Sequence, residues 1–117
     1  MSGATSYHRG LAAEEAVARR YERAGHRIVG RRWRGSGGEI DLIARRGEET
    51  VFVEVKAAET HGRAAESLGA RQIGRLLASG SEYMATLEAG MLSPVRFDLA
   101  LVDGQGRIEV LENALHG

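Results

Sequence analysis

The sequence GEIDLIARRGEETVFVEVK, residues 38–56, places charged residues inside two apolar segments that are separated by a short polar one. Residues 51–56 are rich in β-branched side chains, which is typical of a strand with both faces covered. On a period of two, Glu54 and Lys56 point to one face of that strand and the valines between them point to the other. Asp41 interrupts the first apolar segment in the same way.

The spacing of the two segments predicts a β-hairpin in which two acidic side chains meet. The residues between the segments are polar and include a glycine, so a two-residue turn at 47–48 would pair Arg46 with Glu49. Counting outward from that pair, Asp41 falls opposite Glu54. Directly opposed residues have Cβ atoms about 4.5–5.5 Å apart, and two carboxylates at that separation repel unless a proton or a cation lies between them.

A divalent metal ion would remove this repulsion. Carboxylates, backbone carbonyls and water are ligands that suit Mg²⁺, and a neighbouring lysine can meet an anionic substrate or steady a water nucleophile. Lys56 is the only lysine in a chain with fifteen arginines, and it stands where a compact ammonium group suits this chemistry. The alternative is a strand whose charges are solvated at the edge of a sheet.

The same residues resemble known proteins. Asp41, followed at hairpin distance by Glu-Val-Lys at 54–56, is similar to the motif of the PD-(D/E)XK superfamily of restriction-endonuclease-like and Holliday-junction-resolvase-like nucleases. The segments GEIDLI and VFVEVK resemble more closely the uncharacterised bacterial YraN-type family. That similarity extends from Gly10 to Ala114, which is nearly the whole chain.

The resemblance implies a metal-dependent nuclease that hydrolyses phosphodiester bonds in branched, damaged or single-stranded DNA or RNA. It implies that Asp41, Glu54 and the carbonyl of Val55 bind Mg²⁺ or Mn²⁺, and that Lys56 orients or activates water. It also implies a third acidic residue, Glu14, from the first helix. At about 100° per residue Glu14 falls within the apolar stripe of that helix. Alternatively, Glu14 lies at the edge of the stripe and reaches water.

Three positions depart from the family pattern. Ala58 stands where an arginine is common, Gln72 where the second helix commonly carries a lysine, and Arg32 where an asparagine is common. These changes leave the metal-binding residues intact and alter positions expected to contact the substrate. The sequence therefore leaves two other functions open: a nucleic-acid-binding module without turnover, and a scaffold that binds another protein.

The N-terminal region is basic, although the net charge of the chain is zero. Residues 1–34 contain eight arginines against three glutamates, an excess of +5. These arginines could bind the phosphates of a nucleic acid, or they reflect a preference for arginine over lysine in this chain. Trp33 could stack on a base, or it closes the edge of the core. The predicted nucleic-acid-binding residues are Arg31, Arg32, Trp33, Arg34 and, in the second helix, Gln72.

Length and composition set further limits. The 117 residues fit one restriction-endonuclease-like domain, residues 1–117. The absence of cysteine excludes disulfides and thiolate metal sites. Because no apolar run of membrane-spanning length and no secretory signal pattern is present, we expect a cytoplasmic protein without a membrane partner. A homodimer is expected by analogy with junction-cleaving nucleases, which cut two strands with two sites.

Periodicity and turn residues predict the remaining elements. They are a helix ending near Arg23, a strand over 26–34, the hairpin, a mobile polar segment over 57–69, a helix over about 70–87, and strands over 95–102 and 107–111. This order, α-β-β-β-α-β-β, predicts an α/β fold with a mixed five-stranded sheet flanked by helices. Gly74 and Gly80 weaken the second helix unless they permit close packing against the sheet. Asp98 is expected to pair with Arg96.

Overall fold

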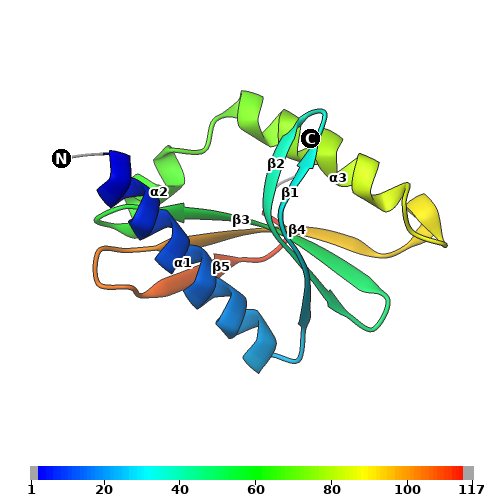
Figure 1. Ribbon diagram of the computed structural model, residues 1–117, viewed down its shortest axis with the longest axis horizontal. Helices are drawn as coiled ribbons and strands as arrows, with labels where there is room; N and C mark the ends of the chain where they lie inside the picture. The colour runs from blue at the N-terminus through cyan, green and yellow to red at the C-terminus, as the bar shows by residue number, and fades with distance from the viewer. Residues whose placement is uncertain (1–2, 115–117) are drawn as a thin grey trace.

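The computed structural model describes residues 3–114, which form one five-stranded sheet with helices on both faces (Figure 1). The elements are α1 (Gly3–Arg23), β1 (Arg27–Gly35), β2 (Gly38–Arg46), β3 (Glu49–Ala57), α2 (His61–Glu66), α3 (Ala70–Met84), the 3₁₀ helix η1 (Gly90–Leu92), β4 (Val95–Val102) and β5 (Ile108–Leu111). The predicted fold class and order are confirmed, with α2 as an addition. In the described range, no helix is long and apolar enough to cross a membrane.

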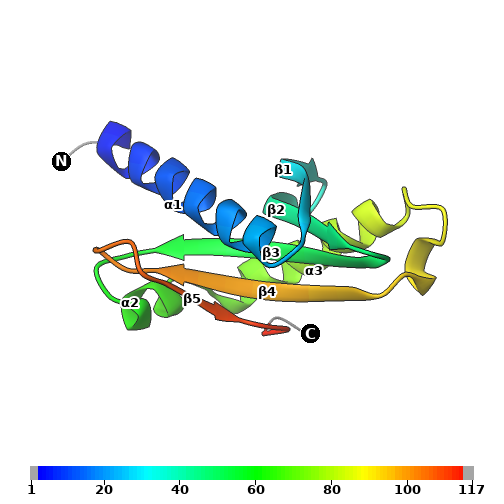
Figure 2. The ribbon, with the colours of Figure 1, turned by 90° about the horizontal axis from the view of Figure 1, so that it is seen from below.

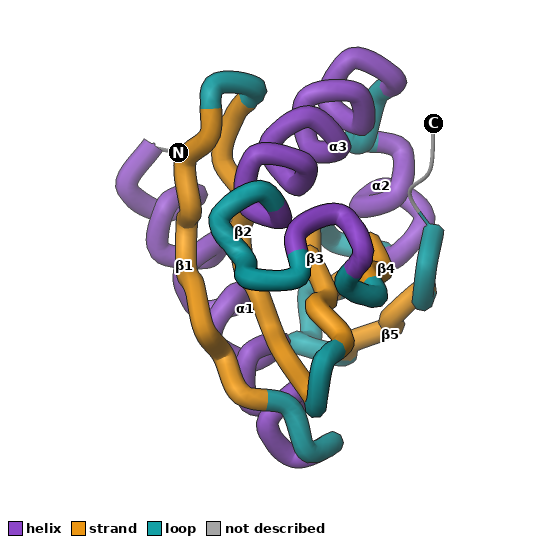
Figure 3. The backbone as a smooth tube through the Cα atoms, turned by 90° about the vertical axis from the view of Figure 1, so that its right-hand side faces the viewer, coloured by secondary structure: helices purple, strands orange, loops and turns teal. Residues whose placement is uncertain are grey.

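The strands lie in the sheet in their chain order, from β1 at one edge to β5 at the other (Figure 3). β3 and β4 run parallel, whereas every other pair of neighbours is antiparallel. A parallel pair needs a long crossover connection, and α2, α3 and η1 supply it. The crossover covers one face of the sheet, and α1 covers the other (Figure 2).

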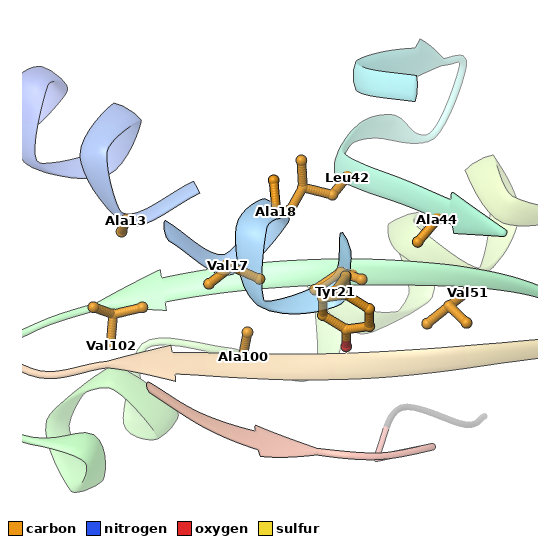
Figure 4. Close-up of a cluster of buried hydrophobic side chains, with 10 residues drawn as sticks. Ala13, Val17, Ala18, Tyr21, Leu42, Ala44, Val51, Ala100 and Val102 are labelled. Atoms are coloured by element: carbon orange, nitrogen blue, oxygen red, sulfur yellow. The ribbon is translucent and has the colours of Figure 1, made fainter. Parts of the chain in front are cut away.

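The apolar stripe of α1 packs on the sheet as expected. Ala13, Val17 and Tyr21 are buried at helical spacing against one face, where Val51 of β3 also lies (Figure 4). Val53 of the same strand belongs to this cluster. Phe52, between the two valines, points to the opposite face and is buried there, so β3 is covered on both sides. The chain can therefore hold a charged side chain on this strand only where the covering helices leave an opening.

The opposite face packs against α3. Phe52 is buried there with Leu76 and Met84 of the helix. Gly80 explains how α3 comes so close: a Cβ at that position would lie 2.5 Å from the Phe97 ring. A Cβ at Gly74 would meet no atom within 4 Å. Close packing therefore accounts for one of the two helix glycines and not for the other.

Two expectations about the crossover are corrected. The polar segment over 57–69 contains α2, which the Thr60 side chain caps by accepting a hydrogen bond from the Arg63 N–H at 3.1 Å. The helix was missed because Ala64 is its only fully buried residue, so its apolar pattern is weak. α3 ends at Met84, whereas Leu87 packs on the core from the turn that follows. Leu87 continues the apolar pattern of α3 although it lies outside the helix, so the predicted helix was too long.

We expect Gly80→Ala to lower the free energy of unfolding by about 1–3 kcal/mol, because the new methyl group overlaps the Phe97 ring. Gly74→Ala is the matched control on the same helix. It should raise the stability by up to about 1 kcal/mol, because alanine favours the helix and the space is open. Urea unfolding followed by circular dichroism measures both changes. Equal effects of the two substitutions would contradict this account of the packing.

Candidate metal and catalytic site

The β2–β3 hairpin has the register expected from the sequence. Arg46 pairs with Glu49 across a two-residue turn, and the ladder keeps that register along both strands. The next level beyond its last pair brings Asp41 beside Glu54. There a side chain replaces a backbone carbonyl as the hydrogen-bond acceptor: Asp41 Oδ2 accepts a hydrogen bond from the Val55 N–H at 2.8 Å. A side chain thus fixes the end of the hairpin.

The two carboxylates meet at the end of the hairpin, where Glu54 is buried and Asp41 is partly buried. Glu54 is only 5% exposed, and its carboxyl group lies within hydrogen-bonding reach of Asp41. Burial and then the Asp41 charge raise the pKa of Glu54 to about 8, and burial raises the pKa of Asp41 as well. The Oε1 atom of Glu54 is buried and has no hydrogen-bond partner. At neutral pH the pair therefore needs a shared proton or a cation.

Gln72 of α3 connects the acids to the lysine. Its Nε2 donates a hydrogen bond to Glu54 Oε2 at 2.6 Å, and its Oε1 accepts one from Lys56 Nζ at 3.0 Å. Lys56 Nζ also lies 3.3 Å from Glu54 Oε2. Because one amide satisfies both groups, the unpartnered Oε1 of Glu54 is left for another ligand. Both ends of the Gln72 amide are thus occupied within the protein. That Gln72 contacts nucleic acid stays a prediction.

These side chains line a pocket of about 620 Å³. Its walls come from α1, β2, β3 and the first half of α3. The lining residues are Glu14, Gly38, Glu39, Asp41, Glu54, Val55, Lys56, Gly69, Arg71, Gln72, Arg75 and Leu76. The four predicted catalytic residues, Glu14, Asp41, Glu54 and Lys56, are therefore brought together in one pocket, although they come from three elements.

Glu14 is held on the pocket wall by Arg32. The guanidinium donates to Glu14 Oε1 from Nε at 3.1 Å and from Nη2 at 2.9 Å. Arg32 has a left-handed backbone with a φ of +50°, which is uncommon for a residue other than glycine and is often found at functional sites. Burial, and then the Asp41 charge, raise the pKa of Glu14, and Arg32 opposes that rise.

The donor atoms fit a hard divalent cation. The pocket floor offers two carboxylates, one of them with an orphaned buried oxygen, and oxygen is the ligand that Mg²⁺ prefers. Over residues 3–114, no group of three or more His, Asp or Glu side chains is arranged to hold a metal ion. This is compatible with Mg²⁺, because the ion is usually bound through one or two carboxylates and completes its shell with water and substrate phosphates.

The other residues predicted to bind nucleic acid lie on β1 and have partners within the protein. Arg31 and Arg34 form ion pairs with acidic side chains at 2.9 and 3.4 Å. Trp33 packs edge-to-face on Tyr83, with ring centroids 5.4 Å apart, at the margin of the core. The structure therefore places Trp33 where the core alternative expected it. Whether these residues also bind nucleic acid stays a prediction.

Two arginines of the pocket were not predicted from the sequence. Arg71 and Arg75 lie one helical turn apart on α3, and within the described part of the chain neither side chain makes an ion pair or hydrogen bond. Their spacing of four residues beside Gln72 was the available signal. It was hidden because arginine is common throughout the chain.

Comparisons with known proteins agree on one family. The model of "Uncharacterised protein family UPF0102" matches residues 13–102, which include the pocket residues. The chain is 58% identical to a UPF0102 protein of Ruegeria pomeroyi over 116 residues, covering 98% of this chain and 94% of that protein. It is 54% identical to a UPF0102 protein of Cereibacter sphaeroides over 114 residues, covering 97% of both. A UPF0102 protein of Roseobacter denitrificans is 46% identical over 114 residues, covering 97% of this chain and 88% of that protein.

The pair of carboxylates, Asp41 and Glu54, makes the stability of the metal-free protein depend on pH. The pKa of Glu54 is about 8 in the folded protein and near 4.5 in the unfolded chain, so the folded state holds its proton to higher pH. The free energy of unfolding should therefore fall as the pH rises from about 4.5 to about 8. Asp41→Asn removes the neighbouring charge and should flatten this fall. Urea unfolding across that pH range with EDTA present measures it, and parallel profiles for the two proteins would contradict the coupling.

Proposed function

This chain belongs to the family UPF0102, and we propose that it is a metal-dependent nuclease that hydrolyses phosphodiester bonds in DNA or RNA. One observation carries the proposal: Asp41, Glu54 and Lys56 lie together at the floor of one pocket. Two paired carboxylates with an adjacent ammonium group suit the hydrolysis of a phosphate ester. Family membership by itself names no activity.

In this proposal the hairpin supplies the ligands. Asp41 and Glu54 would hold Mg²⁺ or Mn²⁺, with the carbonyl of Val55 as a further oxygen. When bound, the ion would polarise the scissile phosphate and stabilise the negative charge that develops as water attacks. The protein prepares for this by burying Glu54 and partly burying Asp41, so that both carboxylates are poorly solvated and gain by meeting a cation.

Lys56 would act on the water or on the substrate. Its Nζ is held by Gln72 and Glu54, so the ammonium group faces the pocket in a fixed position. An ammonium held there can orient a water molecule or contact a phosphate oxygen. Gln72 would then be a positioning residue, because it acts through Lys56 and Glu54. Glu14, kept in place by Arg32, would be a further acidic group that orients water at the edge of the site.

A second candidate is a nucleic-acid-binding module without turnover. It is favoured by the Gln72 amide, which occupies Lys56 and Glu54 by hydrogen bonds within the protein. Both candidates take nucleic acid as partner, and a homodimer would allow either one to engage two strands. They differ in whether Asp41 and Glu54 are needed for the function.

We expect Asp41→Asn and Glu54→Gln to abolish Mn²⁺ and Mg²⁺ binding measured by calorimetry. Both should also lower metal-dependent cleavage of branched, single-stranded and RNA substrates by about 100-fold or more, because ligands of the ion are lost. Glu48→Gln, in the turn at the other end of the hairpin, is the matched control and should change neither. Circular dichroism checks that each variant is folded.

Salt-sensitive nucleic-acid binding that survives both substitutions, without cleavage by the wild-type protein, would favour the binding module instead. Cleavage that both folded variants retain would exclude this site as the catalytic centre.

Lys56→Met separates binding of the ion from chemistry. The substitution keeps much of the side-chain volume and removes the charge, so the carboxylates should still bind Mn²⁺. Cleavage should fall by about 100-fold or more, the range expected when a group that assists proton transfer is lost. Calorimetry and single-turnover cleavage measure the two effects. Full activity of Lys56→Met would remove Lys56 from the proposed mechanism.

A further inference from the structure

We propose that the phosphate backbone of the substrate lies along the first half of α3, where Arg71 and Arg75 bind it, and not along the arginines of β1. This inference rests on the proposed function, because it names how that site receives its nucleic acid.

The first argument is the pairing of the arginines. On β1, Arg31, Arg32 and Arg34 each contact a carboxylate of the protein, at distances between 2.9 and 3.4 Å. Arg71 and Arg75 are exposed, line the pocket, and contact no carboxylate in residues 3–114. A phosphate would have to displace an existing partner at each of these three β1 arginines, whereas on α3 it would meet a guanidinium that is available.

The second argument is the position of the two arginines above the acidic floor. They are four residues apart, so their side chains project from the same side of α3, about one helical turn from each other. Gly69, the N-cap of α3, lies on the same wall and offers no side-chain cap to the N–H groups of the first turn. These groups favour an anion, and the helix dipole adds to the effect. The rim of the pocket therefore attracts phosphate, while the unpartnered carboxylate oxygen of Glu54 on the floor calls for a cation.

The second half of α3, in contrast, already has a protein segment packed against one side. The tip of the β1–β2 hairpin lies against it, with Ser79 Oγ donating to the Gly38 carbonyl at 2.8 Å and the Ser36 N–H donating to the Glu82 carboxylate at 3.0 Å. A Cβ at Gly37 would lie 2.7 Å from the Arg75 carbonyl oxygen, so the contact is tight. This contact begins at the backbone of Arg75, whose side chain stays exposed, so the open part of the helix is the turn from Arg71 to Arg75 that lines the pocket.

The test is nucleic-acid binding measured in EDTA, where hydrolysis does not interfere. The anisotropy of fluorescein-labelled single-stranded DNA would be followed at several salt concentrations for the wild-type protein and for Arg71→Gln/Arg75→Gln. If each arginine contacts one phosphate, the slope of log K against log salt should fall by about 1.4 for a single strand. Single-stranded RNA and a four-way DNA junction, used as further probes, show which polynucleotide carries the backbone.

Arg23→Gln/Arg27→Gln is the matched control. These arginines are also exposed and also lack an ion pair in the described residues, and their loss removes the same charge. They lie away from the pocket, since Arg27 pairs with Arg45 at the opposite end of β2 from Asp41. The control should leave the slope nearly unchanged, and Arg71→Lys/Arg75→Lys should restore most of it.

An equal fall of the salt slope in Arg71→Gln/Arg75→Gln and in Arg23→Gln/Arg27→Gln would overturn the inference, because it would show a general effect of charge. An unchanged slope in Arg71→Gln/Arg75→Gln, or no binding by the wild-type protein to any of the probes, would overturn it too. The proposed function fails in a different way. If the slopes change as expected but no metal supports cleavage, the α3 contact stands and the nuclease proposal does not.

Discussion

The contact between two carboxylates, the buried Glu54 and the partly buried Asp41, is the constraint on which the rest of the site depends. Like charges at this level of the sheet are unfavourable, so the pair must keep a proton or take up a cation. The surrounding groups are arranged around that need: the Val55 N–H binds one acid, and Gln72 binds the other together with Lys56. The sheet supplies rigidity, because both acids lie on central strands covered by helices on each face.

The two halves of α3 have different roles. Its second half is built for contact: Gly80 lets the helix approach the Phe97 ring, and Ser79 and Glu82 hold the hairpin tip. Its first half contributes polar side chains to the pocket and stays open. One helix therefore couples the packing of the sheet to the shape of the site, so a change that tilts α3 would move Gln72 relative to both Glu54 and Lys56.

The fold and the acidic floor were predictable because their signals are local. The alternation along 38–56 and the turn at 47–48 fix the hairpin register, and that register alone places Asp41 beside Glu54. The position of Arg71 beside the same pocket could not be read in this way, since it depends on how the crossover returns over the sheet. α2 was missed for a related reason: its stability comes from a Thr60 cap and one buried alanine, not from an apolar stripe.

The position of β1 at the edge of the sheet suggests a second role for the arginines that it carries. As an edge strand, β1 exposes backbone groups on its outer side that could pair with a strand of another molecule. Arg27, Arg31 and Arg34 are exposed along it, and long charged side chains on such an edge oppose pairing with a second copy. The same arginines would then protect the protein against aggregation through its sheet, and two copies of the chain would have to associate through surfaces other than this edge.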